Sequence, residues 1–289
     1  MKKYAENYTI AEMMAAVCSL QLSNDDVAFV GVGVPLMAGA VAAATHAPEV
    51  TIVYEGGGVG ARSRRMPWTI SDTPTTDNAL AACAMNRIFS DQQRGYITVG
   101  IIGGAEIDKF GNLNTTTIFG ENGSYDHPKV RLPGSGGAND IASSCQRTVI
   151  VMRLQKGKFV NKIDFITSPG FLSGPGEREK AGLLGGGPSV VVTDRGLFRF
   201  DEETKEMYLD AIYPGMTVEQ IKEFIDWDLK VSPQLSVVEP PTEEQIAVMH
   251  TLDPMGTVLG SKSLKGEIEP FDVYYNALKK SYQARKISL

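Results

Sequence analysis

The sequence predicts an α/β protein with an open, mainly parallel sheet flanked by helices. Short, continuous apolar runs alternate with segments of helical period from the N-terminus to about Asp194. Such runs are typical of parallel strands that are buried on both faces. Glycine-rich turns follow several of the runs, and ligand sites in these sheets lie at the carboxyl ends of the strands.

The first elements follow from local signals. Thr9 and Glu12 form a capping box in front of apolar residues at helical spacing, which predicts a helix over residues 10–20. Residues 27–30 are the first expected strand. Pro35 follows it after a glycine-rich turn and can open a second helix, which we expect to run to about residue 46.

The next elements repeat this order. Residues 50–54 are expected as the second strand, and Glu55 follows them directly. A helix is predicted over residues 77–89 and a third strand over residues 96–102. Two further strands are predicted at residues 148–154 and 189–193.

Beyond residue 194 the pattern favours a hairpin, with residues 198–200 and 207–209 as its strands. Two more capping boxes, Thr217 with Gln220 and Thr242 with Gln245, predict short helices. The prolines of Glu239-Pro240-Pro241 indicate a turn rather than a domain linker. A last helix is expected over residues 274–285.

Composition limits the function. The 289 residues are 43% hydrophobic and 21% charged, and the net charge of −6 argues against broad nucleic-acid binding. No apolar run has the length of a membrane span, and no signal-peptide pattern follows the N-terminus. Cys18, Cys83 and Cys145 are widely separated and odd in number, which indicates reduced thiols in the cytoplasm and no metal site.

Glu55 is the sharpest single feature. It stands directly after a strand and directly before Gly56, Gly57 and Gly58. Glycines leave room for a bulky substrate to reach the carboxylate. From chemistry alone, a carboxylate that merely ends a strand at the surface is an equally good interpretation.

Two glycine-rich loops are further candidates. Residues 134–138, Gly-Ser-Gly-Gly-Ala, run into an expected helix and offer backbone N–H groups to an oxyanion or a phosphate. Residues 103–114 begin with Gly103-Gly104 and contain Asp108, Gly111 and Asn112. For each loop taken alone, a plain turn explains the residues at least as well.

The sequence does not assign one role to the arginine cluster or to the histidines. Arg62, Arg64 and Arg65 form a cluster that can bind a substrate carboxylate or a phosphate, although a solvated cluster or a subunit contact is the favoured interpretation. His46, His127 and His250 stand apart without metal spacing, so structural or solvent-facing roles are expected.

Taken together, these segments resemble class I coenzyme A transferases, and in particular the β subunit of glutaconate CoA-transferases. The resemblance rests on Gly31-Val32-Gly33-Val34-Pro35, Glu55-Gly56-Gly57, Gly103-Gly104-Ala105, Gly134-Ser135-Gly136-Gly137-Ala138-Asn139, the run from Asn161 to Gly170, and Val192-Thr193-Asp194. It covers roughly residues 5–258. It therefore implies the NagB/RpiA/CoA-transferase-like fold over residues 1–260, followed by a C-terminal extension over residues 261–289.

The resemblance also implies a site. It makes Glu55 the catalytic nucleophile, which carries CoA as a glutamyl thioester, with no bound cofactor and with coenzyme A as a substrate. The oxyanion or CoA-binding positions that it implies are Gly31, Gly33, Gly103, Gly104, Gly136, Gly137 and Ala138. Glu121, in Glu121-Asn122-Gly123, echoes the wording of some single-chain members but is expected to be a surface turn.

Partners follow from the same resemblance. The family usually builds its site between two subunits, so an α subunit is expected in a hetero-oligomer such as (αβ)2 or (αβ)4. Two alternatives remain open: a hydrolase or decarboxylase that acts on C–C bonds of CoA thioesters, and a non-catalytic partner subunit. Retention of Glu55 counts against both.

Overall fold

The computed structural model describes residues 2–254, 256–259, 275–276, 279 and 283. The chain divides into two compact units, Met1–Ile88 with Pro240–Leu289 (unit 1) and Phe89–Glu239 (unit 2). One boundary falls inside α3 (Met85–Gln93), and the other falls at the proline pair that was expected to be a turn. The helix predicted over residues 274–285 lies mostly outside the described residues, as does the C-terminal extension.

The described residues of unit 1 form four strands in the order β1-β2-β3-β4. The first two, β1 (Val27–Val30) and β2 (Thr51–Val53), are parallel, with Val27 opposite Thr51 and Phe29 opposite Val53. Two short antiparallel strands follow, β3 (Gly58–Val59) and β4 (Ala81–Ala82). Both predicted parallel strands are confirmed, and the second is one residue shorter at each end.

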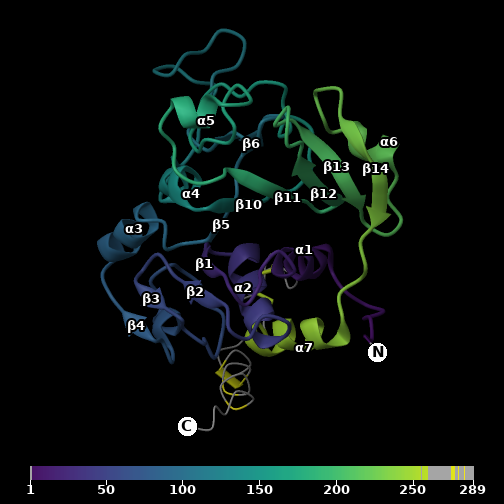
Figure 1. Ribbon diagram of the computed structural model, residues 1–289. Coiled ribbons are helices and arrows are strands. Elements are labelled where there is room, and N and C mark those ends of the chain that lie inside the picture. The colour runs from purple at the N-terminus through teal and green to yellow at the C-terminus, as the bar shows by residue number, and fades with distance from the viewer. Residues whose placement is uncertain (1, 255, 260–274, 277–278, 280–282, 284–289) are drawn as a thin grey trace. The chain divides into compact units, whose positions relative to one another are not determined.

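Three helices in the described part of unit 1 are α1 (Ile10–Ser19), α2 (Val34–Ala44) and α7 (Glu243–Leu252). They pack on one another, and α2 also contacts β1 (Figure 1). At Gly39, an added Cβ would lie 3.1 Å from side-chain atoms of both Val30 and Ile52, so glycine allows α2 to approach the strands closely. Pro35 stands in the first turn of α2, as predicted.

The helix predicted over residues 77–89 is wrong in its first half. A 3₁₀ turn, η1 (Thr73–Thr76), precedes it, and Ala81–Ala82 form β4. Leu80 donates its N–H to the Val59 carbonyl at 2.9 Å, so the hydrogen bonds of the β3–β4 ladder occupy this segment. Only from Met85 onward is the chain helical, as α3.

Unit 2 contributes six sheet strands in the order β14-β13-β12-β11-β10-β5. Its parallel part consists of β5 (Val99–Ile102), β10 (Arg147–Val151) and β11 (Pro188–Val192). The next strands, β12 (Gly196–Phe200) and β13 (Met207–Ile212), are antiparallel, and β14 (Lys230–Val237) runs parallel to β13. The predicted strands and the hairpin are confirmed, and so is the mainly parallel α/β class.

Smaller elements complete unit 2. They are the hairpins β6 (Glu106–Ile107) with β7 (Leu113–Asn114) and β8 (Thr117–Ile118) with β9 (Val130–Arg131), and the helices α4 (Ala138–Ser144), α5 (Glu177–Lys180) and α6 (Val218–Lys222). The capping boxes predicted at Thr9, Thr217 and Thr242 are all formed, because each threonine hydroxyl accepts the N–H of the residue three positions on.

Candidate active site

Glu55 lies in a tight turn between β2 and β3. Gly57 N–H donates to the Tyr54 carbonyl at 2.9 Å, and Tyr54 N–H donates to the Gly58 carbonyl at 2.9 Å. These bonds make Glu55 the second residue of a four-residue turn that closes the hairpin. The carboxylate therefore stands just beyond the carboxyl end of a parallel strand, where sites in α/β sheets lie.

Carbonyl groups of other segments lie against each of the three glycines that follow Glu55. A Cβ on Gly56 would lie 2.4 Å from the Ile70 carbonyl oxygen, and one on Gly57 would lie 1.8 Å from that of Cys83. A Cβ on Gly58 would lie 1.8 Å from the Thr75 carbonyl oxygen. The glycines thus serve to pack three backbone segments around the turn, in addition to leaving room beside Glu55.

The Glu55 carboxylate itself is half-buried. Among the described residues it has no hydrogen bond and no ion pair. Burial raises the pKa of Glu55 above its ordinary value of 4.5. A partly desolvated carboxylate without an internal partner is more nucleophilic than a hydrated one, because water does not have to be removed from it before it reacts.

Gly31 and Gly33 lie at the end of the neighbouring strand. The β1–β2 register, continued by two residues beyond Phe29 and Val53, places Gly31 level with Glu55. Gly33 caps α2 with a φ of +93°, and nothing lies within 4 Å of a Cβ built on it. Unit 1 therefore brings the carboxylate, Gly31 and the open N-terminus of α2 to one edge of its strands.

The three arginines of the cluster have different surroundings. Arg65 forms a two-pronged ion pair with Asp72, with Nη1–Oδ2 at 2.8 Å and Nη2–Oδ1 at 3.1 Å. Arg62 donates from Nη2 to the carbonyls of Pro48 and Val50. Arg64 is exposed. The guanidinium groups of Arg62 and Arg65 are therefore engaged with the protein itself.

The predicted loops of unit 2 meet at Asn114 and Thr115. Ala105 N–H, next to Gly103-Gly104, donates to the Asn114 carbonyl at 3.0 Å, and Gly134 N–H donates to the Thr115 carbonyl at 2.8 Å. A Cβ on Gly104 would lie 2.9 Å from the Leu113 side chain. Two segments separated by about 30 residues in the sequence thus flank the same short strand.

The loop from Gly134 enters α4. Gly134 and Gly136 have positive φ, and no heavy atom lies within 4 Å of a Cβ built on either. Ala138 N–H donates to the Ser135 carbonyl at 3.0 Å, whereas the N–H groups of Gly136 and Gly137 have no hydrogen-bond partner in the described part of the chain. At Gly100, a Cβ would lie 2.2 Å from Ile141, so glycine in β5 lets α4 pack closely.

Asp108 and Asn112 hold the loop over residues 103–114 together through hydrogen bonds. Asp108 accepts hydrogen bonds from the N–H groups of Phe110 and Asn112 and from Asn112 Nδ2. Asn112 in turn accepts N–H groups of Gly170 and Leu172. This network is the glycine- and asparagine-rich turn that the sequence left open as an alternative.

Glu106 is a second buried carboxylate. Its side chain accepts a hydrogen bond from Asn114 Nδ2 at 2.7 Å, and the residue is 7% exposed. Burial raises the pKa of Glu106; Asp164 adds to the rise, and the bond from Asn114 opposes it. No pattern in the sequence gives this residue a role, because nothing local shows that a hairpin buries it.

The remaining candidates behave as expected. Glu121 lies in an exposed turn, which confirms that prediction. His46 Nε2 lies 3.1 Å from the Ser19 carbonyl, His127 is exposed, and His250 pairs with Glu12 at 2.7 Å. These contacts and exposures are those expected of histidines with structural or solvent-facing roles.

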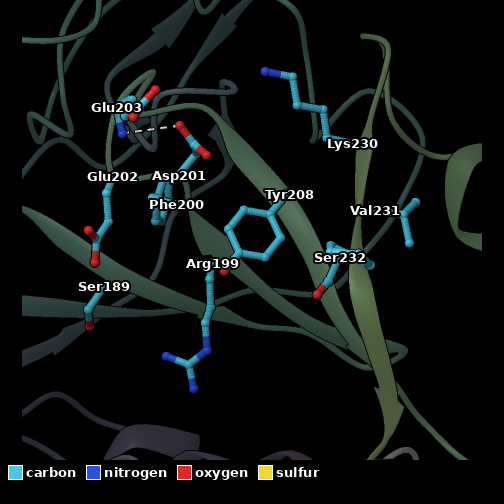
Figure 2. Close-up of a pocket in the computed structure, with 11 residues that line it drawn as sticks. Ser189, Arg199, Phe200, Asp201, Glu202, Glu203, Tyr208, Lys230, Val231 and Ser232 are labelled. Atoms are coloured by element: carbon cyan, nitrogen blue, oxygen red, sulfur yellow. Dashed lines mark hydrogen bonds between the residues drawn. The ribbon is translucent and has the colours of Figure 1, made fainter.

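A separate pocket of about 800 Å³ lies over β12 to β14. Figure 2 shows Arg199, Tyr208, Lys230 and Ser232 around it. Both cations are paired, Arg199 with Asp210 at 2.8 Å and Lys230 with Glu206 at 3.0 Å. None of the predicted site residues lines this pocket.

The described residues contain no group of three or more His, Cys, Asp or Glu side chains that could hold a metal ion. Cys18, Cys83 and Cys145 are free thiols. In the same part of the chain, no helix combines the length and the apolar character needed to cross a bilayer.

Sequence reasoning missed the residues that hold the Glu55 turn from outside. Cys83 donates both its N–H and its thiol to the Gly57 carbonyl, at 3.0 and 3.4 Å. Asp72 accepts the N–H groups of Trp68 and Thr73 as well as Arg65. The order Asp72-Thr73-Pro74 is a capping signal that could have placed the 3₁₀ turn.

Fold and site together define an α/β protein that presents a half-buried carboxylate at the end of a parallel strand. Residues 11–223 match the model of the coenzyme A transferase family. The chain is 39% identical over 254 residues to the B subunit of glutaconate CoA-transferase from Acidaminococcus fermentans, covering 86% of this chain and 94% of that relative. It is 36% identical over 247 residues to the B subunit of 3-oxoadipate CoA-transferase from Pseudomonas knackmussii, covering 85% and 94%.

Solved structures agree with the sequence comparison. The glutaconate CoA-transferase of Acidaminococcus fermentans matches with a TM-score of 0.81 at 37% identity, over 89% of this chain and 99% of that chain. The decarboxylase AibA/AibB matches with a TM-score of 0.73 at 24% identity, over 87% and 97%, a likeness of fold. The chain belongs to the coenzyme A transferase family.

Proposed function

We propose that this chain is the glutamate-bearing subunit of a two-subunit CoA-transferase. It moves CoA from an acyl-CoA donor to a carboxylate acceptor. Membership of the family and the identity to two B subunits support the class of reaction. The observation that carries the proposal is Glu55, a half-buried carboxylate at the end of β2 that has no internal partner among the described residues.

The reaction proceeds through two covalent states of Glu55. The carboxylate attacks the thioester carbonyl of the donor, which breaks the C–S bond and gives a mixed anhydride and CoA thiolate. The thiolate attacks the glutamyl carbonyl of the anhydride, which releases the donor acid and leaves CoA on Glu55 as a thioester. An acceptor carboxylate then reverses these two steps, so that no net oxidation, hydrolysis or ATP is needed.

Backbone N–H groups are the proposed stabilisers of the oxyanions. Within the described chain, Gly136 and Gly137 offer N–H groups without an acceptor, whereas that of Ala138 is used by Ser135. A donor of this kind is worth about 3 kcal/mol to a tetrahedral transition state. We assign Gly31 and Gly33 of unit 1, and Gly103 and Gly104 of unit 2, as further anion- and CoA-binding positions because they follow strand ends.

The proposed enzyme needs a partner. Two of the similar relatives are named as B subunits, so an α-type subunit is expected to complete the CoA pocket, in an (αβ)2 or (αβ)4 assembly. Coenzyme A enters as a substrate, and no resident cofactor is required. Three free thiols are in keeping with a reducing, cytoplasmic location.

Trapping the intermediate tests this function. The purified complex is incubated with acetyl-CoA, butanoyl-CoA, glutaryl-CoA and succinyl-CoA in turn, without an acceptor. CoA should become attached to Glu55, because no acceptor carboxylate is present to take CoA from the glutamyl thioester. Borohydride reduces a thioester, so peptide mass spectrometry after reduction should locate the change at that side chain. An adduct on Glu121, or no adduct with any donor, would refute the assignment.

A decarboxylase is the second candidate, since the decarboxylase AibA/AibB shares the fold. The same assay separates the two. Release of CO2 from an acyl-CoA without a CoA adduct on Glu55 would favour decarboxylation, whereas exchange of CoA between two carboxylates would favour transfer. Full activity of this chain without any partner would contradict the two-subunit assignment.

A further inference from the structure

The turn that carries Glu55 is enclosed by residues 62–84. Three carbonyls of this segment, those of Ile70, Thr75 and Cys83, lie against the three glycines that follow Glu55. The position of the carboxylate therefore depends on how firmly this segment is held. A side chain that fixes the segment also fixes the nucleophile.

Asp72 stands between two of these contact points in the sequence. Its carboxylate accepts the N–H of Trp68 at 3.2 Å and that of Thr73 at 2.8 Å, and it caps the 3₁₀ turn that contains Thr75. Ile70 lies within the loop that the bond to Trp68 closes. One carboxylate thus holds both the Ile70 carbonyl against Gly56 and the Thr75 carbonyl against Gly58.

Arg65 fixes Asp72. Its guanidinium binds both carboxylate oxygens, donates to the Met66 carbonyl at 3.1 Å and lies 5.2 Å from the centre of the Trp68 ring. The two side chains are only 13% and 19% exposed, so this pair is more shielded from solvent than an ordinary surface ion pair. The hydrogen bonds from Arg65 hold the pKa of Asp72 below its usual range.

We propose that Arg65 and Asp72 are a positioning pair for Glu55, and that Arg65 does not bind the carboxylate of a substrate. The inference rests on the proposed function. Both prongs of the Arg65 fork point to Asp72, and the loop that they close contains Ile70, whose carbonyl oxygen lies against Gly56, the residue next to Glu55. A misplacement of about 1 Å in a reacting group can cost about 100-fold in rate.

Four variants of the complete complex test the pair: Arg65→Ala, Arg65→Lys, Asp72→Ala and the double alanine variant. The rate of CoA attachment to Glu55 is measured with acetyl-CoA, which has no free carboxylate, and with succinyl-CoA, which has one. Each single alanine variant should slow attachment by about 10- to 100-fold with both donors. The double variant should be no slower than the worse single variant, because both act through one contact.

Further readouts separate positioning from binding and from general loss of structure. The KM for the acceptor acetate should stay within about 2-fold, and Arg65→Lys should recover part of the rate because it keeps one charged donor. Arg199→Ala is the matched control, since it removes an Arg–Asp pair from β12 and β13. It should leave attachment unchanged. A loss confined to succinyl-CoA, a rise confined to the acceptor KM, or wild-type rates in Arg65→Ala would each overturn the positioning role.

A measurement without turnover keeps the two hypotheses apart. Carbodiimide labelling of Glu55, read by mass spectrometry, should be faster in Arg65→Ala than in the wild type, because a looser turn exposes the carboxylate. If the wild type forms no CoA adduct, the proposed function fails. If the rate of Glu55 labelling is also the same in Arg65→Ala and in the wild type, the positioning role fails with it. If the adduct forms but neither attachment nor labelling changes in the variants, only the positioning role fails.

Discussion

Two glutamates that follow parallel strands of this chain differ in their hydrogen bonding. Glu55 follows β2 in unit 1, and Glu106 follows β5 and Gly103-Gly104 in unit 2. Burial raises the pKa of both. Glu106, however, accepts a hydrogen bond from Asn114, whereas Glu55 has no partner among the described residues. A raised pKa alone therefore does not mark a nucleophile. A carboxylate without an internal hydrogen-bond partner is the more informative feature.

The packing of backbone around the two glutamates also differs. Around Glu55, all three following glycines would clash with carbonyl oxygens of other segments if they carried a Cβ. Before Glu106, a Cβ on Gly103 would lie 3.1 Å from the Val151 carbonyl oxygen, and one on Gly104 would lie 2.9 Å from the end of the Leu113 side chain. A small shift can relieve both contacts. The turn of unit 1 is thus the more tightly enclosed of the two.

The largest expected difference is in activity. Glu55→Gln should lower CoA transfer by about 10⁴-fold or more, because a neutral amide cannot form the anhydride. Glu55→Asp should also be severely impaired, since the carboxylate is drawn back by one methylene. Glu106→Gln should keep transfer within about 10-fold. Steady-state assays of the complex measure all three, and equal losses at the two glutamates would remove the distinction between them.

The next expected difference is in how much a glycine-to-alanine substitution destabilises the protein near Glu55 and near Glu106. Gly57 has a φ of +112°, and its Cβ would lie 1.8 Å from the Cys83 carbonyl oxygen, so Gly57→Ala should lower the free energy of unfolding by roughly 2 to 4 kcal/mol. Gly103→Ala should cost about 1 kcal/mol or less. Urea unfolding monitored by circular dichroism gives both values. Comparable costs would mean that the enclosure of the Glu55 turn is looser than the contacts indicate.

The acid side of the pH profile follows from the raised pKa of Glu55. Nucleophilic attack needs the carboxylate, so CoA attachment should be lost as pH falls through the folded-state pKa, which lies above the ordinary 4.5. The single-turnover rate of adduct formation, measured against pH, reports this value. Glu106→Gln should leave that limb in place. A limb at the ordinary glutamate value would show that Glu55 is hydrated before substrate binds.

Much of the fold followed from local patterns. Capping boxes at Thr9, Thr217 and Thr242 and the apolar run at Val27–Val30 were predicted correctly because neighbours in the sequence determine them. The segment around Ala81 was predicted as helix, since its pairing with Val59 depends on residues more than twenty positions away. Likewise the sequence alone singled out Glu55 and its glycines as candidates, but it gave no signal for the contacts of Asp72 or Cys83 with that turn. Their contacts with the turn form only when the chain folds back.

The smallest effect concerns the stability of unit 2 and tests Glu106 directly. A folded-state pKa above the unfolded value means that the folded chain binds this proton more tightly, so stability is fully present below the unfolded pKa and is lost as pH rises through the folded pKa. Glu106→Gln keeps an oxygen that can accept from Asn114 Nδ2 and removes the buried charge near Asp164. The variant should therefore be slightly more stable than the wild type at pH 7.

Melting temperatures of wild type and Glu106→Gln, compared between about pH 4.5 and pH 8, measure this difference. The gap should widen as pH rises and narrow toward the lower limit, as the wild-type carboxyl takes up its proton. Asp164→Asn is the matched control, because it removes the neighbouring charge while the amide oxygen can still accept the Phe119 N–H that Asp164 Oδ2 accepts at 2.7 Å. It should reduce the gap without closing it, since burial is the larger cause of the shift. A gap that is constant with pH would mean that Glu106 ionises as it does in water and is not the committed, buried partner of Asn114.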